Sequence, residues 1–183
     1  MSVQRSVDEP ILAGAVVLSR VFDAPRELVF EAWTKAEHFS RWFGPHGAEV
    51  LSLVIEPRPG GVIRFAHRFE DGATIHLKGT FSEVVQDQRL VFTIGFVDEH
   101  GRPGGHPMLP DWPLDGLIES TVRLEDAGHG TRVSVVQRVL PLEAASHAAV
   151  KQHQLLAREG WTQTLDRLDE HLATRRGREE RKG

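Results

Sequence analysis

The stretch that most constrains the fold lies near the N-terminus, where an apolar run leads directly into a helix-start signal. Residues 15–22 read AVVLSRVF, a strand-like run. Asp23 and Pro25 follow, and both favour a helix start, because proline lacks only a donor that the first turn leaves unpaired and a carboxylate there faces the positive end of the helix dipole. The next apolar residues fall on one face of that helix: Leu28, Val29, Ala32 and Trp33. The chain therefore begins with a strand and a short amphipathic helix.

A second short helix is predicted over 35–43, with Thr34 as its N-cap and Gly44-Pro45 as its end. From there the apolar period changes to two, which is typical of strands. The predicted strands are 50–56, 62–69, 74–85, 90–96, 117–124 and 131–140. Gly79 interrupts one of them, and we expect it to mark a bulge or a bend where the sheet curls. These strands predict an antiparallel meander.

Residues 98–116 hold four glycines and four prolines, so no regular element fits them. A loop of this length in a compact domain is either functional or mobile.

The last element is a long helix, predicted from about residue 142 to 174, roughly 48 Å at 1.5 Å per residue. Its apolar stripe repeats at helical spacing: Trp161, Leu165, Leu168 and Leu172. With 183 residues and 40% apolar content the chain suits one domain, over 14–175. We expect a flexible arm at 1–13 and a disordered basic tail at 176–183.

The N-terminal block resembles a known family when it is taken with three later features. These are the segment Arg41–Pro45, the turn Pro57-Arg58-Pro59-Gly60-Gly61 and the pair Gly160-Trp161. The resemblance is to domains related to the activator of the Hsp90 ATPase, within the START-like, or polyketide-cyclase-like, superfamily, and it runs from about Val16 to His171. It implies an α+β helix-grip fold of the START/Bet v 1 type. In that fold a curled antiparallel sheet wraps a long C-terminal helix, two short helices follow the first strand, and a cavity lies between sheet and helix.

Composition excludes several classes of protein. The chain has no cysteine, which excludes disulfides, thiolate metal sites and a cysteine nucleophile, and fits a reducing compartment, so the cytoplasm is the expected location. A net charge of -4 argues against a nucleic-acid surface. No stretch approaches the roughly 18 apolar residues of a membrane span. The ten histidines include no His-x-x-x-His pair, so neither a metal nor another cofactor is expected.

The cavity is the first candidate site, because a concave apolar space with a few polar groups is where ligands usually bind. Strand alternation directs Phe65 and His67 inward and gives Phe81 and Glu83 a shared parity on the neighbouring strand. Aromatic residues of the helices are the other candidates: Trp33, Trp42, Phe43 and Trp161. All four also suit core packing, and the short segment around Trp42 and Phe43 is the one we expect to move when a ligand enters.

Two classes of function follow. The first is a binding protein whose cavity holds a small hydrophobic or amphipathic ligand, such as a lipid, an aromatic metabolite or a polyketide-like compound. The second is a cyclase- or hydrolase-type enzyme that uses an inward Glu83, Glu119 or His67 as a general base, since desolvation raises the pKa of a buried carboxylate. The chain has no tyrosine and no Gly-x-Ser-x-Gly elbow, so binding is favoured over catalysis.

A third function, stimulation of Hsp90 as a co-chaperone or a role in the stress response, is implied only by the resemblance. Eukaryotic members with that role carry a separate Hsp90-binding domain, and about thirteen residues before this domain leave no room for one, so Hsp90 is not an expected partner. A homodimer through an exposed strand or the long loop is compatible with an open sheet edge.

Overall fold

The structure of the protein, a computed structural model, describes residues 15–140, 147–179 and 181. The expected arm at 1–13 and the predicted start of the long helix at 142–146 lie outside the described residues. The described strands are β1 (Ala15–Phe22), β2 (Glu49–Ile55), β3 (Val62–Arg68), β4 (Thr74–Val85), β5 (Arg89–Val97), β6 (Leu117–Ala127) and β7 (Gly130–Leu140). The helices are α1 (Arg26–Thr34), α2 (Ala36–Trp42) and α3 (His147–Glu179).

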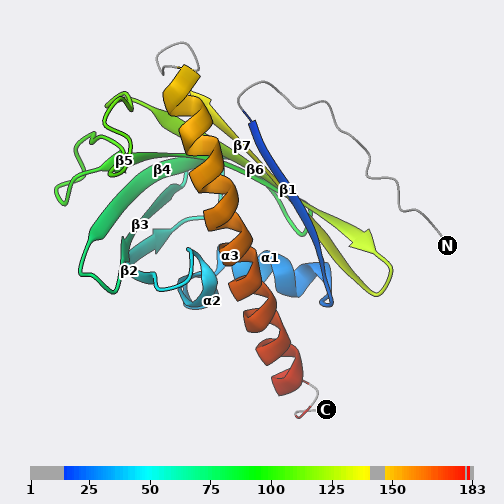
Figure 1. Ribbon diagram of the computed structural model, residues 1–183. Coiled ribbons are helices and arrows are strands. Elements are labelled where there is room, and N and C mark those ends of the chain that lie inside the picture. The colour runs from blue at the N-terminus through cyan, green and yellow to red at the C-terminus, as the bar shows by residue number, and fades with distance from the viewer. Residues whose placement is uncertain (1–14, 141–146, 180, 182–183) are drawn as a thin grey trace.

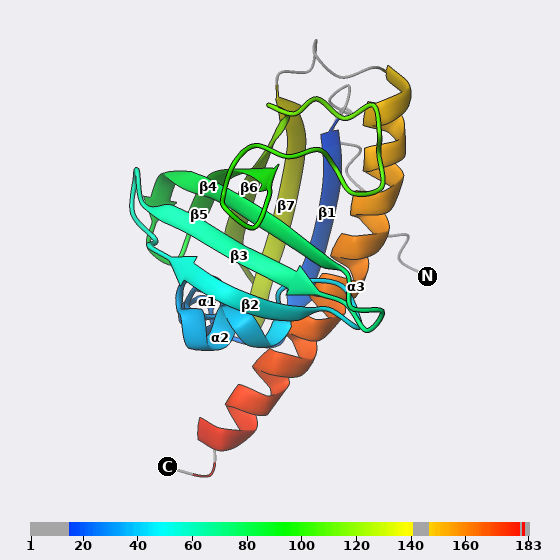
Figure 2. The same cartoon turned by 90° about the vertical axis from the view of Figure 1, so that its left-hand side faces the viewer.

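Within the described residues the seven strands form one antiparallel sheet in the order β1-β7-β6-β5-β4-β3-β2. All neighbours except β1 and β7 are consecutive in the chain, so β2 to β7 form a meander and β1 pairs with β7 at its edge. Figure 1 shows α3 crossing the concave side of the sheet, with α1 and α2 at one end of it. Turned by 90°, Figure 2 shows the sheet curling around that helix. The fold is therefore the α+β helix-grip arrangement that the sequence predicts.

Alternation along the strands decides which side chains face α3. On β7, Thr131, Val133, Val135, Gln137 and Val139 are buried, while the residues between them are more exposed. The curl brings strands close together at Gly79, where a Cβ atom would lie 1.7 Å from the carbonyl oxygen of Thr93. This close approach, rather than a bulge, explains why residue 79 is a glycine, because Gly79 pairs regularly with both β3 and β5. The register shift in β4 lies instead between Phe81 and Glu83.

The predicted cap of α2 is wrong. Thr34 ends α1 and its hydroxyl donates to the carbonyl oxygen of Phe30, so the residue before α2 is Lys35. Pro25 precedes α1 as expected, but Asp23 makes no capping bond there and forms an ion pair with Arg176 of α3.

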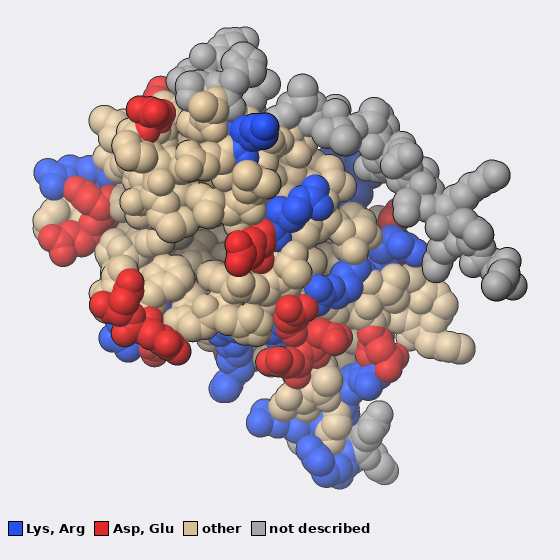
Figure 3. Space-filling view, viewed as in Figure 1, with Lys and Arg blue, Asp and Glu red and all other residues tan. Residues whose placement is uncertain are grey.

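The C-terminal tail is also more ordered than predicted. Helix α3 continues through Glu179, so residues 176–179 are helical rather than disordered. Basic side chains in the last turn of a helix interact favourably with its dipole, and the ion pair of Arg176 with Asp23 fastens this turn to the start of α1. Figure 3 shows basic side chains gathered at this end of α3. Within the part of the chain that the structure describes, no helix is apolar over a stretch long enough to span a membrane.

Candidate functional site: an apolar pocket between sheet and helix

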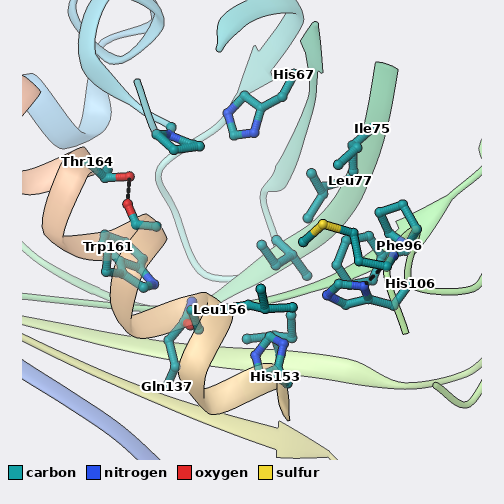
Figure 4. Close-up of a pocket in the computed structure, with 18 of the residues that line it drawn as sticks. His67, Ile75, Leu77, Phe96, His106, Gln137, His153, Leu156, Trp161 and Thr164 are labelled. Atoms are coloured by element: carbon teal, nitrogen blue, oxygen red, sulfur yellow. Dashed lines mark hydrogen bonds between the residues drawn. The ribbon is translucent and has the colours of Figure 1, made fainter. Parts of the chain in front are cut away.

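A pocket of about 210 Å³ lies between the concave face of the sheet, the N-terminal half of α3 and the loop 98–116 (Figure 4). The sheet supplies one wall. Its side chains come from the inward-facing positions of β3, β4 and β5: Phe65, His67, Ile75, Leu77, Ile94 and Phe96. Further along the sheet, β6 adds Ile118 and β7 adds Gln137. The wall is thus mostly apolar, and its polar members are single residues at its two ends.

The opposite wall is one face of α3. Its residues repeat at helical spacing: His153, Leu156, Ala157, Gly160, Trp161 and Thr164. At Gly160, an added Cβ atom would meet nothing within 4 Å. Ala157 has only a methyl side chain and Gly160 has none, and this leaves the space that the pocket occupies.

The segment after α2 forms one edge of the pocket, with Phe43, Gly44 and Pro45. It is fixed to α3 by Arg167, whose Nη1 donates to the carbonyl oxygens of Gly44, Pro45 and Ala48, each at 3.0 Å. Gly44 has a φ of +115°, and a Cβ atom there would lie 2.7 Å from Nε2 of His67. Only glycine fits this position without strain, so the pocket edge is set by backbone geometry and by an arginine on the helix.

The loop 98–116 forms the other edge, with His106, Pro107 and Met108. Its course is fixed by hydrogen bonds. The Gly104 N–H donates to the carbonyl oxygen of Phe96 at 2.9 Å, and the Arg102 Nε donates to Asp98 at 2.7 Å. Two of its apolar side chains, Leu109 and Trp112, are buried. The loop therefore has a defined conformation and forms part of the pocket wall.

Three histidines line the pocket, and burial lowers the pKa of each to about 4. For His67, a hydrogen bond to the backbone of Phe43 acts in the opposite direction but is outweighed, and its Nε2 is buried with no hydrogen-bond partner in the described part of the chain. For His153, the neighbouring His106 adds to the effect of burial, and both ring nitrogens are buried without a partner among the described residues. All three side chains are neutral at pH 7.

The histidines on the two edges differ in their neighbours. His67 lies beside aromatic rings of the α2 segment and β3, with Phe65 at 5.0 Å and Phe43 at 6.0 Å between ring centroids. The ring of His153 packs on that of Trp112, with centroids 4.8 Å apart, and the ring centroid of His106 lies 5.8 Å from that of His153. Figure 4 shows His67 at one end of the pocket and His106 at another, with Leu156 and His153 on the helix side.

Four of the residues that the sequence singles out line this pocket: Phe43, Phe65, His67 and Trp161. Two others lie behind its edge. Trp33 stacks on Trp161 with ring centroids 5.9 Å apart, and Trp42 is fully buried, donating from its indole nitrogen to the carbonyl oxygen of Ala32 at 2.9 Å. Phe81 is in the core as well, where it meets Phe92 edge to face at 5.7 Å, away from the pocket. These three rings support the pocket without forming its surface.

Neither Glu83 nor Glu119 lies at the pocket, contrary to the expectation that both are polar residues of the cavity. Glu119 alternates with the buried Ile118 and Ser120, so it points to the other face of β6. Glu83 follows the register shift of β4 and forms an ion pair with Arg89 at 3.4 Å, with both side chains partly exposed. Strand alternation explains why Glu119 faces away from the pocket, and the register shift in β4 explains the position of Glu83.

Sequence reasoning missed four polar residues of the pocket, namely His106, Gln137, His153 and Thr164. A signal existed for three of them: His153 and Thr164 share a helix face with Trp161, and Gln137 shares strand parity with buried valines. His106 lies in a loop without periodicity, so no pattern indicates it. In the described ranges, no group of three or more His, Cys, Asp or Glu is arranged to hold a metal ion.

A sheet curled around one long helix, with an apolar pocket between them, defines a helix-grip protein of the START-like class. The chain belongs to the family described as Activator of Hsp90 ATPase homolog 1-like protein, whose model matches residues 23–173.

Solved structures agree with this assignment of the fold. A protein from Arthrobacter aurescens is 24% identical with a TM-score of 0.75, and the match covers 92% of this chain and 91% of that one. A protein from Chromobacterium violaceum is 25% identical with a TM-score of 0.68, covering 87% and 96%. The AHSA1 protein of Silicibacter pomeroyi is 21% identical with a TM-score of 0.69, covering 88% and 99%. None of the curated proteins matches the sequence.

Proposed function

We propose that this protein binds a compact, mainly apolar small molecule in the pocket between the sheet and α3. The observation that carries the proposal is the pocket itself, a hollow of about 210 Å³ that opens to solvent between the sheet and the long helix. Its walls are formed by aliphatic and aromatic side chains, with a few polar groups among them, which is the usual composition of a ligand site.

The size of the pocket limits the ligand. At about 210 Å³ it exceeds the roughly 150 Å³ apolar cavity that accommodates benzene in another protein. A single ring with a few further atoms fits this space. Long-chain lipids and multi-ring polyketides need more room than the pocket has in this structure, so we favour single-ring aromatic compounds within the broader class of hydrophobic ligands.

The experiment is a titration with ethylbenzene, followed through the backbone and indole N–H signals in ¹H–¹⁵N NMR spectra. We expect binding by the parent protein. Ala157→Phe places a ring in the pocket from the helix wall, so we expect it to weaken binding at least tenfold while the fold is kept. Leu155→Phe is the matched control, because Leu155 lies on the same helix with 66% of its surface exposed. An Ala157→Phe protein that binds as well as the parent would contradict the proposal, as would a parent protein that binds no single-ring compound.

No observation favours the enzymatic alternative to the same degree. Its carboxylate candidates, Glu83 and Glu119, do not line the pocket, and its remaining candidate is the neutral His67.

A further inference from the structure

The walls of the pocket say something about the charge of its ligand. Among the described residues that line it, none is Asp, Glu, Lys or Arg. Arg167 is the charged residue tied to its edge, and its Nη1 already donates to three carbonyl oxygens. A charged ligand would lose its hydration without gaining a counterion, which costs far more than burying a neutral group.

The histidines do not change this conclusion. With a pKa of about 4, His67, His106 and His153 carry no charge at pH 7. They remain polar, however, and a wholly apolar ligand that displaces water from Nε2 of His106 leaves that nitrogen unpaired. Leaving a buried polar group unpaired is unfavourable. A ligand with a hydrogen-bonding group of its own avoids that cost.

His106 is the histidine whose donor can be assigned. Its Nδ1 accepts a hydrogen bond from the backbone N–H of Met108 at 3.1 Å, so in the neutral ring the proton is on Nε2. That Nε2–H has no partner among the described residues, and it is not among the polar atoms that are fully enclosed. The ring is held in place by Phe96 at 4.6 Å and Trp112 at 5.4 Å. A fixed and unpaired donor at the pocket edge is what recognises an acceptor oxygen.

We propose that the ligand is uncharged at neutral pH and carries a carbonyl or hydroxyl oxygen that accepts a hydrogen bond from Nε2–H of His106. This rests on the proposed function, because it names the chemistry of the ligand for the same pocket. The opposite side of the pocket offers an acceptor to a hydroxyl ligand. Gln137 donates from its amide nitrogen to the hydroxyl oxygen of Ser120 at 3.0 Å, which orients the amide and leaves its oxygen without a hydrogen-bond donor among the described residues.

Three single-ring probes of similar size test the inference: ethylbenzene, acetophenone and benzoate, titrated separately at pH 7 and followed by NMR. We expect ethylbenzene and acetophenone to bind, and benzoate to bind at least tenfold more weakly than acetophenone. His106→Phe keeps an aromatic ring against Phe96 but removes the donor. We expect it to weaken acetophenone about fivefold, since a hydrogen bond is worth about 1 kcal/mol, and to change ethylbenzene by less than about twofold.

Two further variants make the outcome readable. His100→Phe is the matched control, because His100 is on the same loop with its side chain 66% exposed and outside the pocket, and we expect parent affinities for all probes. His106→Gln keeps a side-chain N–H donor, and we expect it to lose less affinity for acetophenone than His106→Phe does. If the phenylalanine variant disturbs the pocket in general, the ratio of the acetophenone and ethylbenzene affinities remains the readout.

The possible failures are distinguishable. Binding of ethylbenzene with benzoate as tight as acetophenone, or with an affinity ratio that His106→Phe does not change, overturns the inference and leaves the proposed function standing. Binding of none of the three probes overturns both.

Discussion

Two hollows lie along α3, and they surround their histidines with opposite chemistry. The pocket near the N-terminal half of the helix has no charged side chain in the walls described. The second hollow, a cleft of about 390 Å³ between α2 and the C-terminal half of α3, is lined almost wholly by polar and charged residues: Glu37, His38, Arg41, His171, Thr174, Arg175 and Arg178. We call it the basic cleft.

Both hollows lower the pKa of a histidine to about 4, and burial is the largest cause in each, but the additional causes differ. In the pocket, burial is the main cause for His153, with a smaller contribution from His106. In the basic cleft, burial of His171 is joined by repulsion from the charges of His38 and three arginines, Arg175, Arg41 and Arg178. The comparison shows that a lowered pKa does not by itself identify the kind of site. The pocket excludes charge, whereas the cleft concentrates it.

The largest expected effect concerns acid stability and the pocket. The native pKa of His153, about 4, lies below the ordinary value of 6.5, so between these values the unfolded chain binds more protons than the native protein. Its contribution to stability is complete above pH 6.5 and is lost as the pH falls toward 4, on the order of 3 kcal/mol for a shift of this size. We expect His153→Leu to remove this part of the pH dependence, measured as the free energy of unfolding in denaturant from pH 7 to pH 4.

His129→Leu is the control for that measurement, because His129 is exposed in the turn between β6 and β7 and should keep the parent slope. A His153→Leu protein with the parent's pH dependence would mean that the pocket histidine is not buried as neutral imidazole, and the contrast with the cleft would fail.

The next effect concerns the charges of the basic cleft. Arg175 donates from Nη2 to Glu31 at 2.7 Å and from Nη1 to the carbonyl oxygen of Leu28 at 3.2 Å, and its side chain is only 13% exposed. We expect Arg175→Met to lower the free energy of unfolding by about 2 kcal/mol, because hydrogen bonds to charged groups are worth about 1.5–3 kcal/mol. Arg178→Met, at an exposed position of the same helix, should cost less than about 0.5 kcal/mol. Equal losses for both variants would show that Arg175 contributes no more than a surface arginine.

The smallest effect separates the two causes of the lowered pKa directly. Salt screens the repulsion between His171 and the arginines of the basic cleft, so we expect the pKa of His171 to rise when the salt concentration increases from 0.05 to 0.5 M. The pKa of His153 should change less, because burial is the main cause of its lowered pKa and no arginine contributes to it. Imidazole signals in NMR titrations at both salt concentrations measure this. A pKa of His153 that rises as much as that of His171 would remove the distinction between the hollows.

The sequence predicted the elements well because each has a strong local signal. Period-two alternation placed Phe65 and His67 on the inner face, and the structure confirms that both lie there. The caps were predicted poorly because a capping side chain can find a distant partner, as Asp23 does in Arg176.

The site was harder to predict than the fold. Strand alternation places Glu119 on the correct face only when the register of the sheet is known. The register shift between Phe81 and Glu83 means that alternation counted from Phe81 no longer predicts the face of Glu83. His106 owes its position to turns within the loop, to the hydrogen bond from the Met108 N–H and to ring contacts with Phe96 and Trp112. Such contacts have no periodic signal.

The hydrogen bonds of Arg167 imply that one edge of the pocket forms late in folding. The residue lies in α3, which follows every strand in the chain, yet it holds the segment after α2 by four backbone oxygens, those of Arg41, Gly44, Pro45 and Ala48. During synthesis the strands and the first two helices leave the ribosome before this arginine does. The pocket edge with Phe43 and Gly44 therefore lacks these four hydrogen bonds until the last helix emerges and docks, and a nascent chain paused before α3 would display the apolar inner face of the sheet to chaperones.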